Sequence, residues 1–134
     1  MIKGNKGEWS EIYVILRSLA EGKIYAADSD LNKLEDIYFP IIKIIREEIK
    51  GEVKEYHTGQ LINIFVNGEK KVELPASEFD SEATTLLEEI KRKVSTSAFS
   101  VNSTEEFMGR ILCYKLAAPA RDKSDITINI VDVQ

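Results

Sequence analysis

The sequence predicts an α+β fold, an antiparallel β-meander with flanking helices. Between residues 37 and 74, short β-branched and apolar runs are separated by turn-forming residues, which is typical of strands joined by tight turns. On both sides of this region, apolar residues recur at three- and four-residue steps, and that spacing gives a helix one apolar face. With 134 residues, the chain is expected to form a single domain, 1–134.

Composition excludes several classes of protein. Apolar residues make up 43% and charged residues 31%, as in an ordinary water-soluble globular chain. The net charge of −5 gives no support to nucleic-acid binding through bulk charge, so a polyanion would need a local basic patch. Cys113 and His57 are the only cysteine and histidine, which argues against a disulfide, a thiolate metal cage or a histidine-based zinc site.

The N-terminus has no apolar core of a signal peptide, and no apolar run is long enough to span a bilayer. The sequence is therefore expected to belong to a cytoplasmic protein that does not bind membranes.

The first expected element is a helix from about Glu8 to Ala20, ended by Gly22, and a short strand over 23–28 follows it. The meander then turns at Lys50-Gly51, Gly59-Gln60 and Asn67-Gly68. Its first run, 41–49, is interpreted as a strand because it is rich in isoleucine, although its isoleucines also fit one face of a helix.

Two helices and a strand are expected in the remainder. Ser77 or Asp80 caps a helix that runs to about Val94, and Ser103 with Glu106 forms a capping box that opens a second helix, ended by residues 117–120. The last strand, 126–131, alternates isoleucine with polar residues.

Three acidic residues are candidates for a site. Asp125 stands at the mouth of the last strand, where a carboxylate can hold a divalent metal on a rigid support, although aspartate before a strand is also a common turn residue. Glu8 and Glu11 share a neighbouring face in the first turn of the first helix. The helix dipole is the alternative explanation for each of them.

Other signals are weaker. The hydroxyl-rich run 95–102, which contains Ser97, can donate hydrogen bonds to phosphate oxygens, but such runs are more often simply solvated. Triplets of glutamate, any residue and lysine, such as Glu48-Ile49-Lys50 and Glu52-Val53-Lys54, are expected by chance in a chain rich in both residues. His57 lies among charged residues of the meander and indicates no catalytic triad.

Four stretches together resemble a known family. Residues 5–13, 22–28, 31–33 and 122–128 are similar to HpaII-type type II restriction endonucleases, and they follow the family order over nearly the whole chain. This family is placed in the PD-(D/E)xK nuclease superfamily of prokaryotic restriction systems. There, an aspartate begins one core strand, and the next strand carries an acidic residue, a spacer and a lysine.

The resemblance implies hydrolysis of phosphodiester bonds in double-stranded DNA with Mg²⁺ as cofactor. It implies Asp125 and Glu11 as metal ligands, with Glu8 as the second choice for the helix glutamate. The family name implies a short GC-rich palindromic target, for which a homodimer is a natural expectation. Residues in the resembling region that suit contacts to DNA are Lys115, Arg121, Lys123 and Ser97.

The sequence departs from the superfamily pattern after Asp125. The nine residues 126–134 contain no acidic residue followed by a spacer and lysine. The chain is therefore expected to be the N-terminal portion of a longer endonuclease, with an incomplete catalytic core and no activity of its own. The alternative is a non-catalytic α+β module that binds DNA or protein, in which Asp125 is a turn residue and the glutamates only balance the helix dipole.

Overall fold

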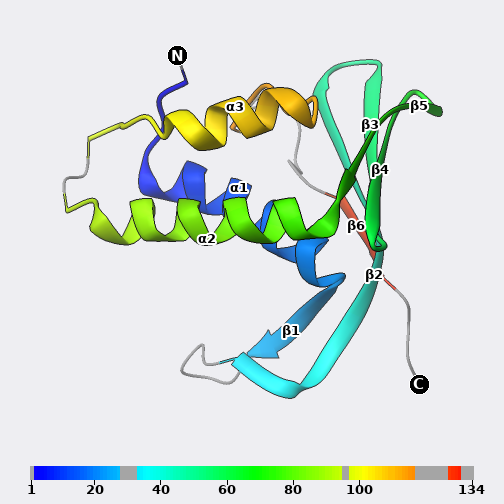
Figure 1. The fold of residues 1–134 in the computed structure, drawn as a ribbon, viewed down its shortest axis with the longest axis horizontal. Helices are drawn as coiled ribbons and strands as arrows, with labels where there is room; N and C mark the ends of the chain where they lie inside the picture. The colour runs from blue at the N-terminus through cyan, green and yellow to red at the C-terminus, as the bar shows by residue number, and fades with distance from the viewer. Residues whose placement is uncertain (1, 28–32, 95–96, 117–126, 131–134) are drawn as a thin grey trace.

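A computed structural model describes residues 2–27, 33–94, 97–116 and 127–130 (Figure 1). Its elements, in chain order, are α1 Lys6–Glu21, β1 Lys23–Ala27, β2 Lys33–Ile49, β3 Glu52–His57, β4 Leu61–Val66, β5 Glu69–Pro75, α2 Ala76–Arg92, α3 Asn102–Arg110 and β6 Thr127–Ile130.

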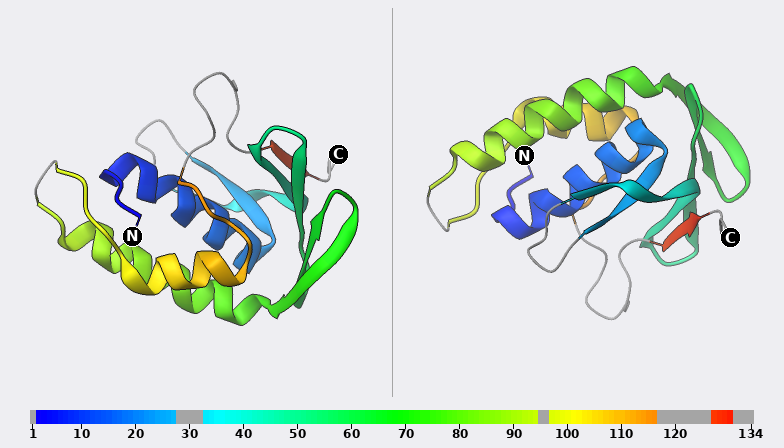
Figure 2. Two further views of the ribbon diagram at one scale, coloured as in Figure 1. Left: turned by 90° about the horizontal axis from the view of Figure 1, so that it is seen from above. Right: turned by 90° about the horizontal axis from the view of Figure 1, so that it is seen from below.

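The strands form an antiparallel sheet in the order β1-β2-β3-β4-β5, and β6 also pairs with β2. The predicted meander is therefore confirmed, and 41–49 is strand rather than helix. β2 is 17 residues long, which allows it to pair with β1, β3 and β6. All three helices lie together on one side of the sheet, as the two perpendicular views also show (Figure 2).

The expected hairpin turns are present because their residues accept left-handed backbone angles. Asn67 and Gly68 have φ values of 50° and 84°, and together they connect β4 to β5. Such a pair of positive φ angles matches the right-handed twist of the strands that it joins. Gly51, at the turn from β2 to β3, has a φ of 89°.

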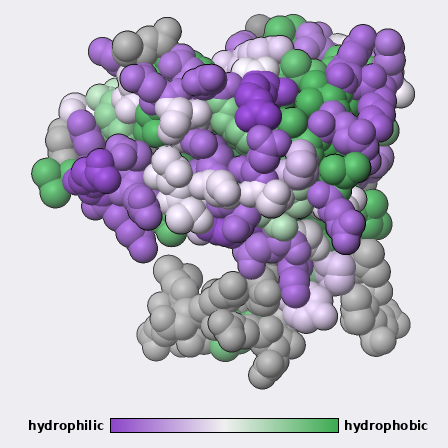
Figure 3. Space-filling view, viewed as in Figure 1, coloured by the Kyte–Doolittle hydropathy of each residue, from purple (hydrophilic) through white to green (hydrophobic). Residues whose placement is uncertain are grey.

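Helix α1 follows the predicted apolar stripe. Trp9, Ile12 and Leu16 are at most 1% exposed on its inner face. The helix packs against α2, and α2 packs against α3. Phe79 and Phe107 join these two helices, with ring centroids 5.1 Å apart in an edge-to-face arrangement. Polar residues cover most of the outer helical surface visible in Figure 3.

The predicted start of α2 is wrong. The helix begins at Ala76, directly after Pro75, and no side chain in the described part of the chain caps it. Ser77 and Asp80 already lie inside the first turns, and Asp80 instead pairs with Arg17 of α1. Proline, with its fixed φ, sets the helix entrance here.

The predicted bounds of α3 are also wrong. The helix begins at Asn102, and the hydroxyl of Ser103 donates to Glu82 of α2 at 3.2 Å instead of forming a capping box. The helix ends at Arg110 rather than near residue 117. Leu112 takes a left-handed φ of 60°, and this turns the chain away from the helix axis.

Candidate active site

The N-terminal end of α1 is organised by a reciprocal cap. The amide of Glu8 donates to Oδ1 of Asn5 at 2.9 Å, and the amide of Asn5 donates to Oε1 of Glu8 at 3.0 Å. Glu8 therefore has a structural role that accounts for its presence at this position. Glu11, one turn further along, takes no part in the cap and has a half-buried side chain.

The segment after α3 returns to this end of α1. Leu116 is 6% exposed and packs beside Gly4, so closely that a Cβ atom added to Gly4 would overlap Cδ1 of Leu116. The same added atom would lie 3.4 Å from Cβ of Glu8 and 3.4 Å from Nε1 of Trp9. Leu116, the described residue nearest in sequence to Asp125 on its N-terminal side, therefore lies beside the first turn of α1.

On the other side of Asp125, the chain is part of the sheet. β6 pairs antiparallel with β2, and Thr127 lies opposite Ile45 in the register. The predicted last strand is thus confirmed, two residues after Asp125. Asp125 itself, together with Arg121 and Lys123, lies outside the described residues.

Three charged side chains that sequence reasoning did not single out meet inside the protein. Arg46, Glu48 and Lys54 are each 1% exposed. Oε2 of Glu48 lies 3.2 Å from Nε of Arg46, and Oε1 of Glu48 lies 3.1 Å from Nζ of Lys54. This buried charge cluster sits on the side of β2 and β3 that faces the helices, in phase with the buried Ile44 and Tyr56.

The buried charge cluster fixes the segment 112–115 to the sheet. Glu48 accepts the amide of Tyr114 at 3.0 Å, Lys54 donates to the carbonyl of Leu112, and Arg46 donates to the carbonyl of Lys115. Buried charges are stable only when their partners are in place. Since main-chain groups of residues 112–115 are among these partners, the main chain of this segment is held in one position.

Lys115 and Ser97, the two described candidates for DNA contact, are both exposed. Nζ of Lys115 lies 3.5 Å from the carbonyl oxygen of Glu48, at the outer limit of a hydrogen bond. Its main chain is thus held by Arg46, and its side chain is exposed apart from this contact.

The thiol of Cys113 and the hydroxyl of Tyr56, both near the buried charge cluster, are poor nucleophiles. Burial raises the pKa of the Cys113 thiol to about 12 and holds the pKa of the Tyr56 hydroxyl well above its usual value. Both therefore stay protonated at neutral pH. Cys113 is 2% exposed and packs as a small hydrophobic residue.

His57 belongs to a separate polar group that forms no catalytic triad within the described residues. Its Nε2 lies 3.0 Å from Oε1 of Glu55, and its ring contacts that of Phe65 in a tilted arrangement, with centroids 4.6 Å apart. A hydrogen bond from Lys43, followed by one from His57, lowers the pKa of Glu55.

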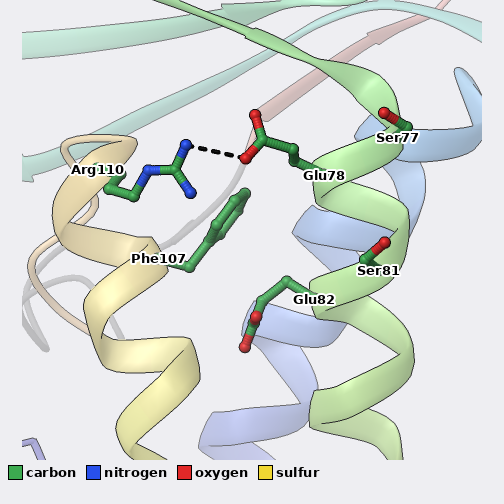
Figure 4. A pocket seen from close by; sticks show the side chains of 6 residues that line it. All are labelled: Ser77, Glu78, Ser81, Glu82, Phe107 and Arg110. Carbon is green, nitrogen blue, oxygen red and sulfur yellow. Dashed lines mark hydrogen bonds and ion pairs between the residues drawn. The ribbon is translucent and has the colours of Figure 1, made fainter.

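A pocket between α2 and α3 is also a poor candidate for the active site (Figure 4). Arg110 pairs with Glu78 at 2.9 Å, and Glu82 accepts hydrogen bonds from Ser103 and Thr104. Its charged groups thus satisfy one another. Its lining residues are Ser77, Glu78, Ser81, Glu82, Phe107 and Arg110.

Within the described residues, no three His, Cys, Asp or Glu side chains gather as a metal site would require. Both candidate glutamates on α1 offer carboxylate oxygens, and that of Glu8 already accepts a hydrogen bond from the amide of Asn5. Carboxylate oxygen is the ligand type that Mg²⁺ prefers. The described part of the chain also has no helix both long and apolar enough to cross a membrane.

Comparison with known proteins assigns the chain to the restriction endonucleases. The model of the HpaII restriction endonuclease family matches residues 5–134. The chain belongs to this family, as the four resembling stretches indicated.

One relative is the type II restriction enzyme HpaII of Haemophilus parainfluenzae. It is 39% identical over 133 residues, a match that covers 98% of this chain and 37% of that enzyme. The chain thus spans well under half the length of this relative. No solved structure matches the chain significantly.

Proposed function

We propose that this chain forms part of a type II restriction endonuclease that hydrolyses phosphodiester bonds of double-stranded DNA with Mg²⁺. The observation that carries the proposal is the 39% identity to a type II restriction enzyme across 98% of the chain. A short GC-rich palindrome is the proposed target. A homodimer suits such a target because a two-fold axis presents the same site to both strands.

Asp125 and Glu11 are the proposed metal ligands. Only Ile126 separates Asp125 from Thr127, which is paired with Ile45 of β2, so the strand that follows Asp125 in sequence belongs to the sheet. Glu11 is the first choice on the resemblance and Glu8 the second, and the carboxylate of Glu8 already serves the helix cap, 3.0 Å from the amide of Asn5. When bound, Mg²⁺ activates the attacking water and offsets charge at the phosphate and the leaving oxygen.

Lys115, Arg121, Lys123 and Ser97 are the proposed DNA contacts. The main chain of Lys115 is held by Arg46, and its side chain is exposed, so its charge can be presented at a fixed place. Contacts of this kind position the DNA backbone without reading its sequence.

Plasmid cleavage by the protein expressed from the complete gene tests the proposal. We expect wild type with Mg²⁺ to cut, Asp125→Asn to abolish cutting, and Glu11→Gln to lower the rate more than about 100-fold, beyond the loss typical of an outer-shell partner. Glu8→Gln is the matched control on the same helix. It keeps an oxygen for the cap and should cut within about threefold of wild type.

Two results would contradict the assignment. Equal cutting by wild type and Asp125→Asn would remove Asp125 from the site. A wild-type protein that binds duplex DNA but never cuts it would favour the non-catalytic binding module instead.

A further inference from the structure

We propose that the end of the molecule where α1 begins and α2 ends binds the DNA backbone. This inference rests on the proposed function and adds the surface that holds the substrate. The N-terminus, the first turn of α1 and the last turn of α2 lie at this end (Figures 1 and 2), and these segments with the residue after α2 carry five cationic residues. This basic end consists of Lys3, Lys6, Lys91, Arg92 and Lys93.

Phe99 joins the two halves of the basic end. Its amide and carbonyl pair with Gly4 at 2.9 and 3.0 Å, and its carbonyl also accepts Nε1 of Trp9 at 2.9 Å. On the other side, Nζ of Lys93 lies 5.2 Å from the centroid of the Phe99 ring. Lys3, next to Gly4, is therefore held near the end of α2, although about 90 residues of sequence separate them.

Within the described residues, four of the five cations of the basic end make no close ion pair, although the acidic residues Glu8, Glu89 and Glu105 lie on the same segments or against them. Arg92 pairs with Glu89 at 2.9 Å, but in the described part of the chain Lys3, Lys6, Lys91 and Lys93 make no ion pair with a carboxylate. Lysines at the opposite end of the molecule differ. Nζ of Lys70 lies 3.4 Å from Glu73, and Nζ of Lys71 lies 3.2 Å from Glu69.

Helix dipoles explain only half of this pattern. Cations in the last turn of α2, such as Lys91 and Arg92, are favoured by the negative end of that helix. Lys6, in contrast, is the first residue of α1, where the positive end of the dipole disfavours a cation. An external anion would stabilise the cations at the end of α2 and Lys6 at the start of α1 at the same time.

Duplex DNA is the polyanion that fits this surface. A chain of net charge −5 needs a local basic patch to approach DNA, and the basic end supplies one. A hollow of about 340 Å³ lies here, lined by Glu89, Arg92, Lys93, Val94, Phe99 and Ser100. The carboxylate of Glu89 is paired with Arg92, and the hydroxyl of Ser100 can donate to a phosphate. Glu11 lies on the helix that begins here, so a backbone bound at this end would lie near one of the two proposed metal ligands.

Binding of a fluorescent duplex to the complete gene product, without Mg²⁺ and over a range of salt concentrations, tests the inference. The variant removes three charges, Lys6→Ala, Lys91→Ala and Lys93→Ala. A matched control removes three exposed lysines from the sheet end, Lys50→Ala, Lys70→Ala and Lys71→Ala. A third protein keeps the charges through Lys6→Arg, Lys91→Arg and Lys93→Arg.

We expect the basic-end variant to bind at least about tenfold more weakly in 0.1 M salt, with a salt slope shallower by roughly 2 to 3. The sheet-end control and the arginine variant should keep the wild-type slope. Because the altered side chains are exposed, apart from the half-buried Lys93, thermal unfolding should stay nearly unchanged.

The inference is wrong if the basic-end variant keeps the wild-type slope or if the sheet-end control weakens equally, even though wild type binds and cuts DNA. A wild-type protein that neither binds nor cuts duplex DNA overturns the proposed function, and this inference with it.

Discussion

Replacing Glu48 by glutamine should be among the most destabilising single changes in this protein. The amide has nearly the volume of the carboxylate and can still accept the Tyr114 amide, so the change removes mainly charge. Arg46 and Lys54 would remain, each 1% exposed, without the anion that now lies 3.2 and 3.1 Å from their nitrogens.

The expected cost follows from that geometry. Removing one partner of a buried ion pair costs about 3–5 kcal/mol, because the remaining charge is left in a medium that solvates it poorly. Here one substitution leaves two such cations. Since roughly 1 kcal/mol shifts the midpoint of a domain of this size by a few degrees, we expect the melting temperature to fall by roughly 10–20 °C.

Thermal unfolding followed by far-UV circular dichroism measures this effect, and Glu47→Gln is the control. Glu47 is exposed on the same strand and accepts one hydrogen bond, from the amide of Gly51 at 2.9 Å, so its loss should cost about 1 kcal/mol or less. Adding Lys54→Met to Glu48→Gln should recover part of the lost stability, because it removes one of the two buried cations that have no anion. Equal melting shifts for Glu47→Gln and Glu48→Gln would refute the reasoning.

Three further predictions concern other parts of the structure. Burial raises the pKa of Cys113 to about 12, so a thiol reagent at pH 8 should label the native protein at least about 100-fold more slowly than the urea-unfolded protein. The free energy of unfolding should also fall as the pH rises above about 9, because the thiol of the unfolded chain ionises first. Gly4→Ala should lower the free energy of unfolding by about 1–3 kcal/mol, measured in urea, because the new methyl group meets Leu116, whereas an unchanged midpoint would mean that Leu116 moves aside freely. Carbon-detected NMR should show Glu55 titrating below its usual pKa, so that its contribution to stability is present above about pH 4.5 and is lost as the pH falls through the lowered pKa, and Lys43→Ala should raise that pKa.

Local signals made much of the fold predictable. Asn67-Gly68 encodes its turn in two adjacent residues, and the apolar stripe of α1 ends at Gly22, whose φ of 70° is the expected helix stop. Helix starts failed where several polar residues competed. Pro75 set the start of α2, and Asp80 forms an ion pair with Arg17 of α1 instead of capping the helix. This contact joins segments that are distant in the sequence.

The buried charge cluster was not predicted, because alternation in a strand assigns charged residues to the solvent side. Arg46 and Glu48 follow Ile44 at steps of two, and Lys54 precedes Tyr56 by two, so their phase matched the buried face. That phase was the available signal. For the candidate site, the sequence ranked Glu11 before Glu8, and the structure adds the reciprocal bonds with Asn5 that give Glu8 a role in the helix cap.

The buried charge cluster also constrains how the family can diverge. Loss of the acid at position 48 alone would leave two buried cations without their anion, and loss of either cation would leave the buried carboxylate with too little positive charge beside it. Single substitutions at these positions therefore give unstable proteins. Positions 46, 48 and 54 are therefore expected to co-vary among related sequences, changing together to an apolar set or not at all. The main chain at 112–115, which is held by these three side chains, would then need a different anchor in any lineage that made the exchange.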